Sequence, residues 1–179
     1  MRNIASVECS EVLYNKVHSL LKDPYNISPD WVSSNDYSIA YSYGDLYLRE
    51  SEWIVSAISS LGFDKCIAMT TETDFSSCSF YEVNLGNRES ILNLVLESAL
   101  CCVLFESSFS FLIVTGDGLY SSVAGSKEFV ETAVGVSLNT AHKLFTIEYG
   151  AKELNLEGSW RQWTNPILAD YDISPDMEP

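Results

Sequence analysis

The sequence predicts a single α+β domain, residues 1–179, in which a central, mostly antiparallel sheet of about five strands is flanked by helices. Segments typical of strands follow one another with hairpin-length turns, and the clearest turn is Asp117-Gly118 between two apolar runs. Segments with the apolar spacing of helices come before and after these strands. Composition agrees, because 46% of the residues are hydrophobic and the mean hydropathy is +0.04, as expected of a chain with a buried core.

The N-terminal part is expected to hold two helices separated by a long connection. Ser10 can cap a helix that runs to about Lys22, where an Asp-Pro pair ends it. Residues 24–47 are rich in Ser, Asn, Asp and Pro, so we expect them to be largely irregular, with room for a short helix or strand. The second helix is expected over residues 47–61, with Gly62 directly after its C-terminus.

The middle of the chain carries the strand signals. The first two strands flank a polar connection, and the last three succeed one another as an antiparallel meander. A helix capped by Asn87, from Arg88 to about Ser98, is expected between these two groups. The expected strands are residues 65–70, 78–83, 100–106, 110–115 and 119–124.

Two further helices are expected after the sheet. The first, residues 127–134, is capped by Ser126 and stopped by Gly135, and the second covers residues 137–149. The acidic, proline-containing residues 165–179 are expected to form a loosely ordered tail.

Charge limits the kinds of partner. The net charge is −15, from 25 acidic and 10 basic residues, which disfavours direct binding to nucleic acid or to an anionic membrane and speeds association with cationic partners. Acidity that serves only solubility is the simpler alternative. The N-terminus lacks the apolar core of a signal peptide, and the most apolar segment, residues 91–105, is too short to span a bilayer. We therefore expect a cytoplasmic protein without membrane contact.

The cysteines favour reduced thiols. Their number is odd, no CxxC pair exists, and neither His18 nor His142 is close to a cysteine in sequence, so we expect no disulfide framework, no structural zinc site and no cofactor. The five cysteines are Cys9, Cys66, Cys78, Cys101 and Cys102.

The candidate binding surface is the acidic, aromatic segment of residues 30–52, in which Arg49 is the only base. Aromatic rings give rigid contact area, and carboxylates accept charge-assisted hydrogen bonds from Arg and Lys. A core-covering loop, with tyrosines packed inward and acids facing water, is the alternative. The expected partner-binding residues are Trp31, Asp36, Tyr37, Tyr41, Tyr43, Asp45, Tyr47 and Glu50.

Catalytic patterns are weaker. The thiols and histidines could supply a nucleophile and a base, but the thiols fit apolar strands better and the histidines fit amphipathic helices better. Two acids in the connection after residue 70 could work as a pair, but they fit a solvated loop better. We therefore expect no enzyme. The alternative is a small cytosolic enzyme or ligand-binding domain with a site drawn from Cys66, Glu72, Asp74, Cys78 and His142.

Residues 111–135, FLIVTGDGLYSSVAGSKEFVETAVG, resemble a strand–turn–strand–cap–helix unit of bacterial immunity proteins, including those of contact-dependent growth inhibition. A small acidic α+β protein without a catalytic motif is similar to this class as well. The resemblance implies stoichiometric binding and neutralisation of a cognate basic toxin, with the basic active site of a nuclease as the target.

Overall fold

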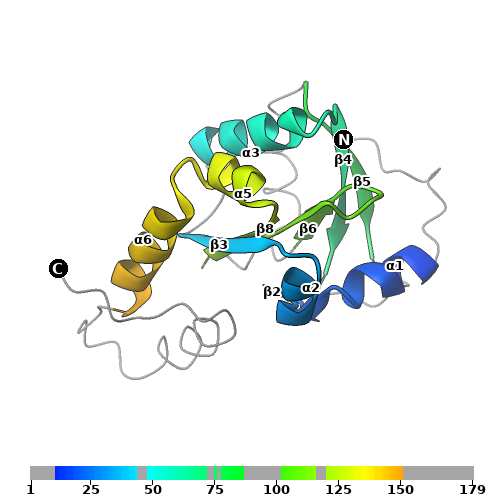
Figure 1. The fold of residues 1–179 in the computed structure, drawn as a ribbon. Coiled ribbons are helices and arrows are strands. Elements are labelled where there is room, and N and C mark those ends of the chain that lie inside the picture. The colour runs from blue at the N-terminus through cyan, green and yellow to red at the C-terminus, as the bar shows by residue number, and fades with distance from the viewer. Residues whose placement is uncertain are drawn as a thin grey trace.

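The computed structural model describes residues 11–43, 48–71, 75, 78–86, 102–115 and 120–150 (Figure 1). The helices are α1 (Glu11–His18), α2 (Pro29–Ser34), α3 (Leu48–Ser60), α5 (Lys127–Val134) and α6 (Leu138–Gly150). The strands are β1 (Leu21–Asp23), β2 (Asn26–Ile27), β3 (Ser38–Tyr43), β4 (Lys65–Thr70), β5 (Phe80–Asn84), β6 (Cys102–Phe105), β7 (Phe111–Thr115) and β8 (Tyr120–Gly125).

The predicted α+β class is confirmed, but the main sheet has six strands rather than about five. Its order is β3-β8-β7-β6-β4-β5, all neighbours are antiparallel, and β1 and β2 form a separate two-stranded sheet. The additional strand is β3, which lies in the segment expected to be largely irregular. Its residues alternate between the two faces of the sheet, with Ile39 and Tyr41 on one side and Ala40 on the other.

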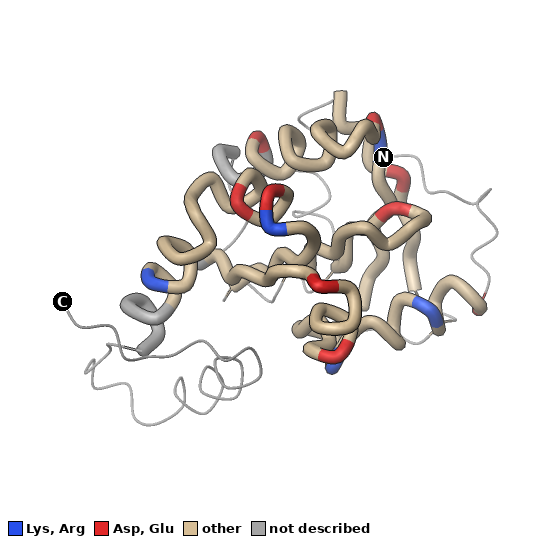
Figure 2. The backbone as a smooth tube through the Cα atoms, viewed as in Figure 1, with Lys and Arg blue, Asp and Glu red and all other residues tan. Residues whose placement is uncertain are grey.

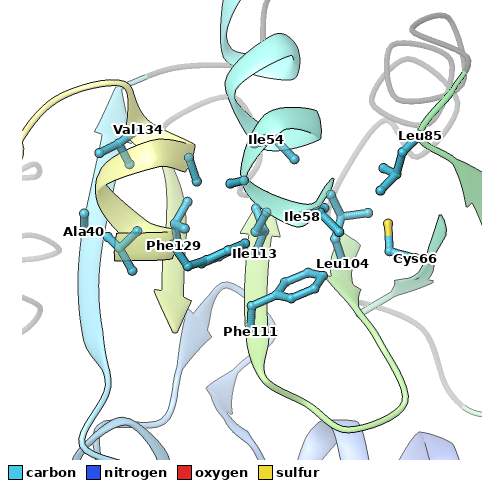
Figure 3. Close-up of a cluster of buried hydrophobic side chains, with 14 of the residues drawn as sticks. Ala40, Ile54, Ile58, Cys66, Leu85, Leu104, Phe111, Ile113, Phe129 and Val134 are labelled. Carbon is cyan, nitrogen blue, oxygen red and sulfur yellow. The ribbon is translucent and has the colours of Figure 1, made fainter. Parts of the chain in front are cut away.

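Helices cover both faces of the sheet, and the central strands β6, β7 and β8 are buried on both sides (Figure 1). On one face α3 and α5 pack against the strands, and Figure 3 shows Ile54 and Ile58 of α3 and Phe129 of α5 directed at Ile113 and its neighbours. On the other face lie α1, the β1–β2 hairpin and α2, together with Phe145 of α6. The result is a layer of helices on each side of one sheet.

Several local predictions are confirmed. β4 has the predicted bounds, and β5 to β8 lie within one or two residues of prediction as far as the structure describes them. Gly62 follows α3 with φ +87°, and its N–H donates to the carbonyl of Ser59. Ser126 Oγ accepts a hydrogen bond from Phe129 N at 3.2 Å, and Gly135 ends α5 with φ +71°.

The first helix is shorter than predicted. α1 ends at His18 rather than near Lys22, and the chain then turns through the β1–β2 hairpin. The turn is held by the Asp23 carboxylate, which accepts hydrogen bonds from Tyr25 N and Asn26 Nδ2, each at 2.9 Å. Short acidic side chains favour turns through such bonds to nearby donors.

The following predictions lie outside the described residues: the Ser10 cap, the helix over residues 88–98, the turn over residues 116–118 and the tail over residues 165–179. Within the described part of the chain, no helix has both the length and the apolar character that crossing a membrane requires.

Candidate functional site

The described part of the acidic, aromatic segment is built around α2. Ser28 precedes the helix with extended backbone angles and Pro29 is its first residue, a position that suits proline because no intrahelical bond needs its missing N–H. Tyr37 N donates to Val32 O at 3.0 Å and Asp36 N donates to Ser33 O at 3.2 Å. This pair of bonds is a complete Schellman motif, which fixes where the chain leaves the helix.

Asp36 occupies the position of this motif where glycine is the usual residue. Its φ is +54°, in the left-handed region that costs an L residue energy, although Asp tolerates it better than most. A carboxylate beside a helix C-terminus is also unfavourable, because that end carries partial negative charge. Asp36 is exposed, so neither disadvantage is offset by burial of its side chain. An exposed residue at such a backbone position is a candidate for contact with another molecule.

Trp31 and Tyr37 meet across this motif. Their ring centroids are 5.2 Å apart at 67°, an edge-to-face contact, and both side chains are half-buried at the margin of the apolar cluster under α2. Asn35 Nδ2 also donates to Trp31 O at 2.8 Å, which ties the end of the helix to its start. We call Asp30, Trp31, Asp36 and Tyr37 the α2 surface; both of its acids are exposed.

Tyr41 does not belong to this surface. It is 2% exposed, its ring stacks on Phe145 at 4.9 Å, and it meets Tyr120 edge-to-face at 5.7 Å. The reason is its register, because Tyr41 lies midway along β3, where it pairs with Ser122 of β8, and its side chain belongs to the buried cluster that includes Phe145 of α6. For this residue the expectation of partner contact is wrong, and the core-covering alternative holds.

The structure does not describe the side chains of the other expected contact residues. Asp45 and Tyr47 lie outside the described residues, and the structure describes only the backbone of Tyr43, in β3, and of Glu50, in α3. The described surface is therefore narrower than the segment predicted from the sequence.

Acidic residues are not gathered at α2. Figure 2 shows Asp and Glu positions on helices and turns throughout the described tube, so the negative field belongs to the molecule as a whole. The α2 surface therefore rests on its ring pair rather than on the density of its acids, and a second partly exposed edge-to-face pair, Tyr14–Phe75, lies outside it. The exposed acids of the described residues are Glu11, Asp30, Asp36, Glu52, Asp64, Glu82 and Glu128.

The residues of the enzymatic alternative are not brought together where the structure describes them. Cys66 is buried among apolar side chains, and burial raises the pKa of its thiol to about 12, so it stays protonated at neutral pH. His142 lies on α6 and its Nε2 is 2.8 Å from the carbonyl oxygen of Ile39, at the edge strand β3. Glu72 and Asp74 are outside the described residues, and no group of three His, Cys, Asp or Glu within the described part could hold a metal ion.

Sequence reasoning missed a buried carboxylate at the β6–β7 turn. Glu106 is 5% exposed and accepts hydrogen bonds from the backbone N–H groups of Ser108 at 2.6 Å and Ser110 at 2.7 Å, and from both serine hydroxyls. Burial raises the pKa of Glu106, but these four hydrogen bonds together hold it below its ordinary value. Every one of these donors comes from the same turn, so the arrangement stabilises the β6–β7 hairpin. The three serines after Glu106 were the signal for it in the sequence.

No protein-family model matches this chain, and neither a curated protein nor a solved structure is similar to it.

Proposed function

We propose that this chain is an immunity protein that binds and neutralises a cognate toxin with a basic surface, acting in the cytoplasm. The observation that carries the proposal is the α2 surface, where a half-buried Trp31–Tyr37 pair occurs with the exposed residues Asp30 and Asp36, each next to one of the rings in the sequence, on a protein of net charge −15. Aromatic anchors bordered by charge are typical of protein–protein contacts.

The physical mode of action follows from charge and shape. A nuclease holds phosphates with basic side chains, so an acidic protein competes with the substrate and is steered quickly to the same site. The rings then slow dissociation, because their contact area is rigid and costs little conformational entropy. Added salt should weaken binding mainly through the association rate.

The experiment pairs this protein with the product of the neighbouring gene. Cells that express that product alone should stop growing, and co-expression of this protein should restore growth. The double variant Asp30→Lys/Asp36→Lys should lose protection and weaken binding of the purified proteins, measured by calorimetry, by about tenfold or more. The matched control is Asp64→Lys/Glu128→Lys, which changes the net charge by the same amount at two exposed acids outside α2, one in the turn between α3 and β4 and one in α5.

Two results would count against the proposal in different ways. Full protection by the double variant would show that the α2 surface is not part of the interface, while the immunity function would still stand. A neighbouring product that never inhibits growth and does not bind this protein would remove the immunity function.

A further inference from the structure

β5 is an open edge of the main sheet. It is the last strand in the sheet order, and within the described part of the chain it pairs only with β4 (Figure 1). The opposite edge strand, β3, packs against α6, where His142 Nε2 lies 2.8 Å from the carbonyl oxygen of Ile39. The sequence of β5, FYEVN, contains no proline or lysine and its register with β4 shows no bulge, so these common protections of an edge strand are missing from it.

The hydrogen bonds at the two ends of β5 show which of its backbone groups point outward. Thr70 N donates to Ser79 O at 3.1 Å, and Leu85 N donates to Asp64 O at 3.0 Å. Both bonds join residues that lie directly opposite each other in the β4–β5 register. In an antiparallel pair, residues bonded to the neighbouring strand alternate with residues whose N–H and C=O point away from it. The odd-numbered residues from 79 to 85 therefore bond to β4, and the even-numbered ones point outward.

Glu82 and Asn84 are the accessible residues with outward backbone groups. Both are exposed, whereas Phe80, the third such residue of β5, is 2% exposed. Within the described part of the chain, no residue bonds to the outward N–H and C=O groups of Glu82 and Asn84. These groups are two donors and two acceptors on an extended backbone, which is the arrangement that an added strand recognises.

We propose that β5 binds an extended, basic segment of another protein as a further strand of the sheet. The segment's backbone pairs with Glu82 and Asn84, and its side chains alternate between the two faces. The Glu82 carboxylate bonds to Lys65 Nζ through Oε2 at 2.9 Å, from the β4 side, so a cation on the added strand approaches it from the other side. The net charge of −15 favours such a segment as well. This inference goes beyond the proposed function and does not depend on it, because it rests on the sheet rather than on the α2 surface.

A second copy of this chain is the other occupant to consider, and charge disfavours it. Two copies would bring two net charges of −15 together. In the antiparallel register that pairs the outward groups of Glu82 with those of Asn84 in the other copy, the two Glu82 carboxylates would be diagonal neighbours on one face of the sheet. Like charges at this spacing repel each other, so the acid on β5 disfavours self-association and favours a basic strand.

The test uses the full chain and two labelled decapeptides, in which threonine alternates with lysine or with glutamate. Threonine suits a strand, and the charges keep both peptides soluble. Fluorescence anisotropy at low salt should show at least about tenfold tighter binding of the lysine peptide. Because net charge alone would also favour the lysine peptide, the position of binding is measured separately.

Amide hydrogen exchange gives that position. In the free protein, the outward amides of Glu82 and Asn84 should exchange faster than those of Tyr81 and Val83, which bond to β4. Saturation with the lysine peptide should slow exchange at Glu82 and Asn84 by about tenfold or more and leave Tyr81 and Val83 little changed.

Glu82→Pro is the variant that blocks the edge. Proline removes an N–H that points outward, so no bond to β4 is lost and the variant should fold, while its ring excludes an added strand. Binding of the lysine peptide should weaken by about tenfold or more. Glu82→Gln is the matched control, because it also removes the charge and the ion pair with Lys65 but keeps the N–H. It should bind the lysine peptide at least about fivefold more tightly than Glu82→Pro does.

The exchange pattern of the wild-type protein decides the inference even if the proline variant does not fold. Absence of binding, equal affinity for the two peptides, protection at other residues only, or affinity unchanged by Glu82→Pro overturns it. A free protein that sediments as a dimer, with the amides of Glu82 and Asn84 already protected, assigns the edge to a second copy and overturns the basic occupant. Growth protection by the wild-type protein is a separate measurement, so the proposed function stands or fails on its own.

Discussion

Removal of the Glu106 carboxylate should destabilise the protein more than any exposed acid does. Glu106→Ala leaves the N–H groups of Ser108 and Ser110 without their acceptor, along with two hydroxyls. A hydrogen bond to a charged group contributes about 1.5–3 kcal/mol, but Ser108 is exposed and water can replace part of what is lost. We therefore expect a decrease of about 2–4 kcal/mol in the free energy of unfolding.

The assay is urea unfolding followed by circular dichroism, with thermal melting as a second measurement. At about 2–4 °C for each kcal/mol in a chain of this size, the melting temperature should fall by about 5–15 °C. Glu128→Gln is the matched control, because Glu128 is exposed and its substitution should change stability by less than about 0.5 kcal/mol.

At acidic pH the wild-type protein should lose part of its higher free energy of unfolding relative to Glu106→Gln. The folded pKa of Glu106 lies below its ordinary value of about 4.3, so the carboxylate stabilises the folded state fully above that value and progressively less as the pH falls through the folded pKa. The difference in unfolding free energy between the two proteins should be constant near neutral pH and shrink below about pH 4. A difference that stays the same down to pH 3, or a loss below about 1 kcal/mol in Glu106→Ala, would refute the reasoning.

Two further predictions concern the packing around the sheet. Gly135→Ala should lower the free energy of unfolding by about 2–4 kcal/mol in urea, because a Cβ there would lie 2.5 Å from a ring carbon of Trp53. Gly62→Ala is the control: its φ is +87°, but nothing lies within 4 Å of the added Cβ, so it should cost only about 1 kcal/mol. Equal losses in the two variants would contradict the close contact with Trp53. His142→Ala should cost about 1 kcal/mol by the same measurement and speed amide exchange in β3, because the Ile39 carbonyl loses its contact at the sheet edge; unchanged exchange there would contradict that role.

Local chemistry made much of the fold predictable. Ser126 and Gly135 bound α5 as the capping rules require, and the apolar run of β4 is a strand with the predicted bounds. β3 was not predicted as a strand, because its Ser and Tyr residues also suit an irregular segment and its pairing with β8 joins residues far apart in the sequence. Sequence rules describe neighbours along the chain, and this strand exists because of neighbours across the sheet.

The candidate site could be predicted only in part for the same reason. The composition of residues 30–52 indicated rings beside acids, and Trp31 and Tyr37 are partly exposed at the surface. Nothing in the sequence pattern distinguished the buried Tyr41 from the partly exposed rings, because its orientation depends on its register against Ser122. The position of Asp36 depends on a left-handed residue at the end of α2, which a sequence with Asp in place of Gly does not signal.

The helices on both sides of the sheet bury one side in the core and leave the other at the surface, so the residues that hold the fold together differ from the two acids of the proposed contact surface. The buried clusters take their residues from the sheet and from the inner sides of the helices, and neither Asp30 nor Asp36 belongs to them. Those two acids could therefore be exchanged without touching the buried clusters, and under the proposed function such an exchange would alter the choice of partner. Asp30 would be the freer of the two positions, because the backbone at Asp36 has positive φ and favours Gly, Asn or Asp.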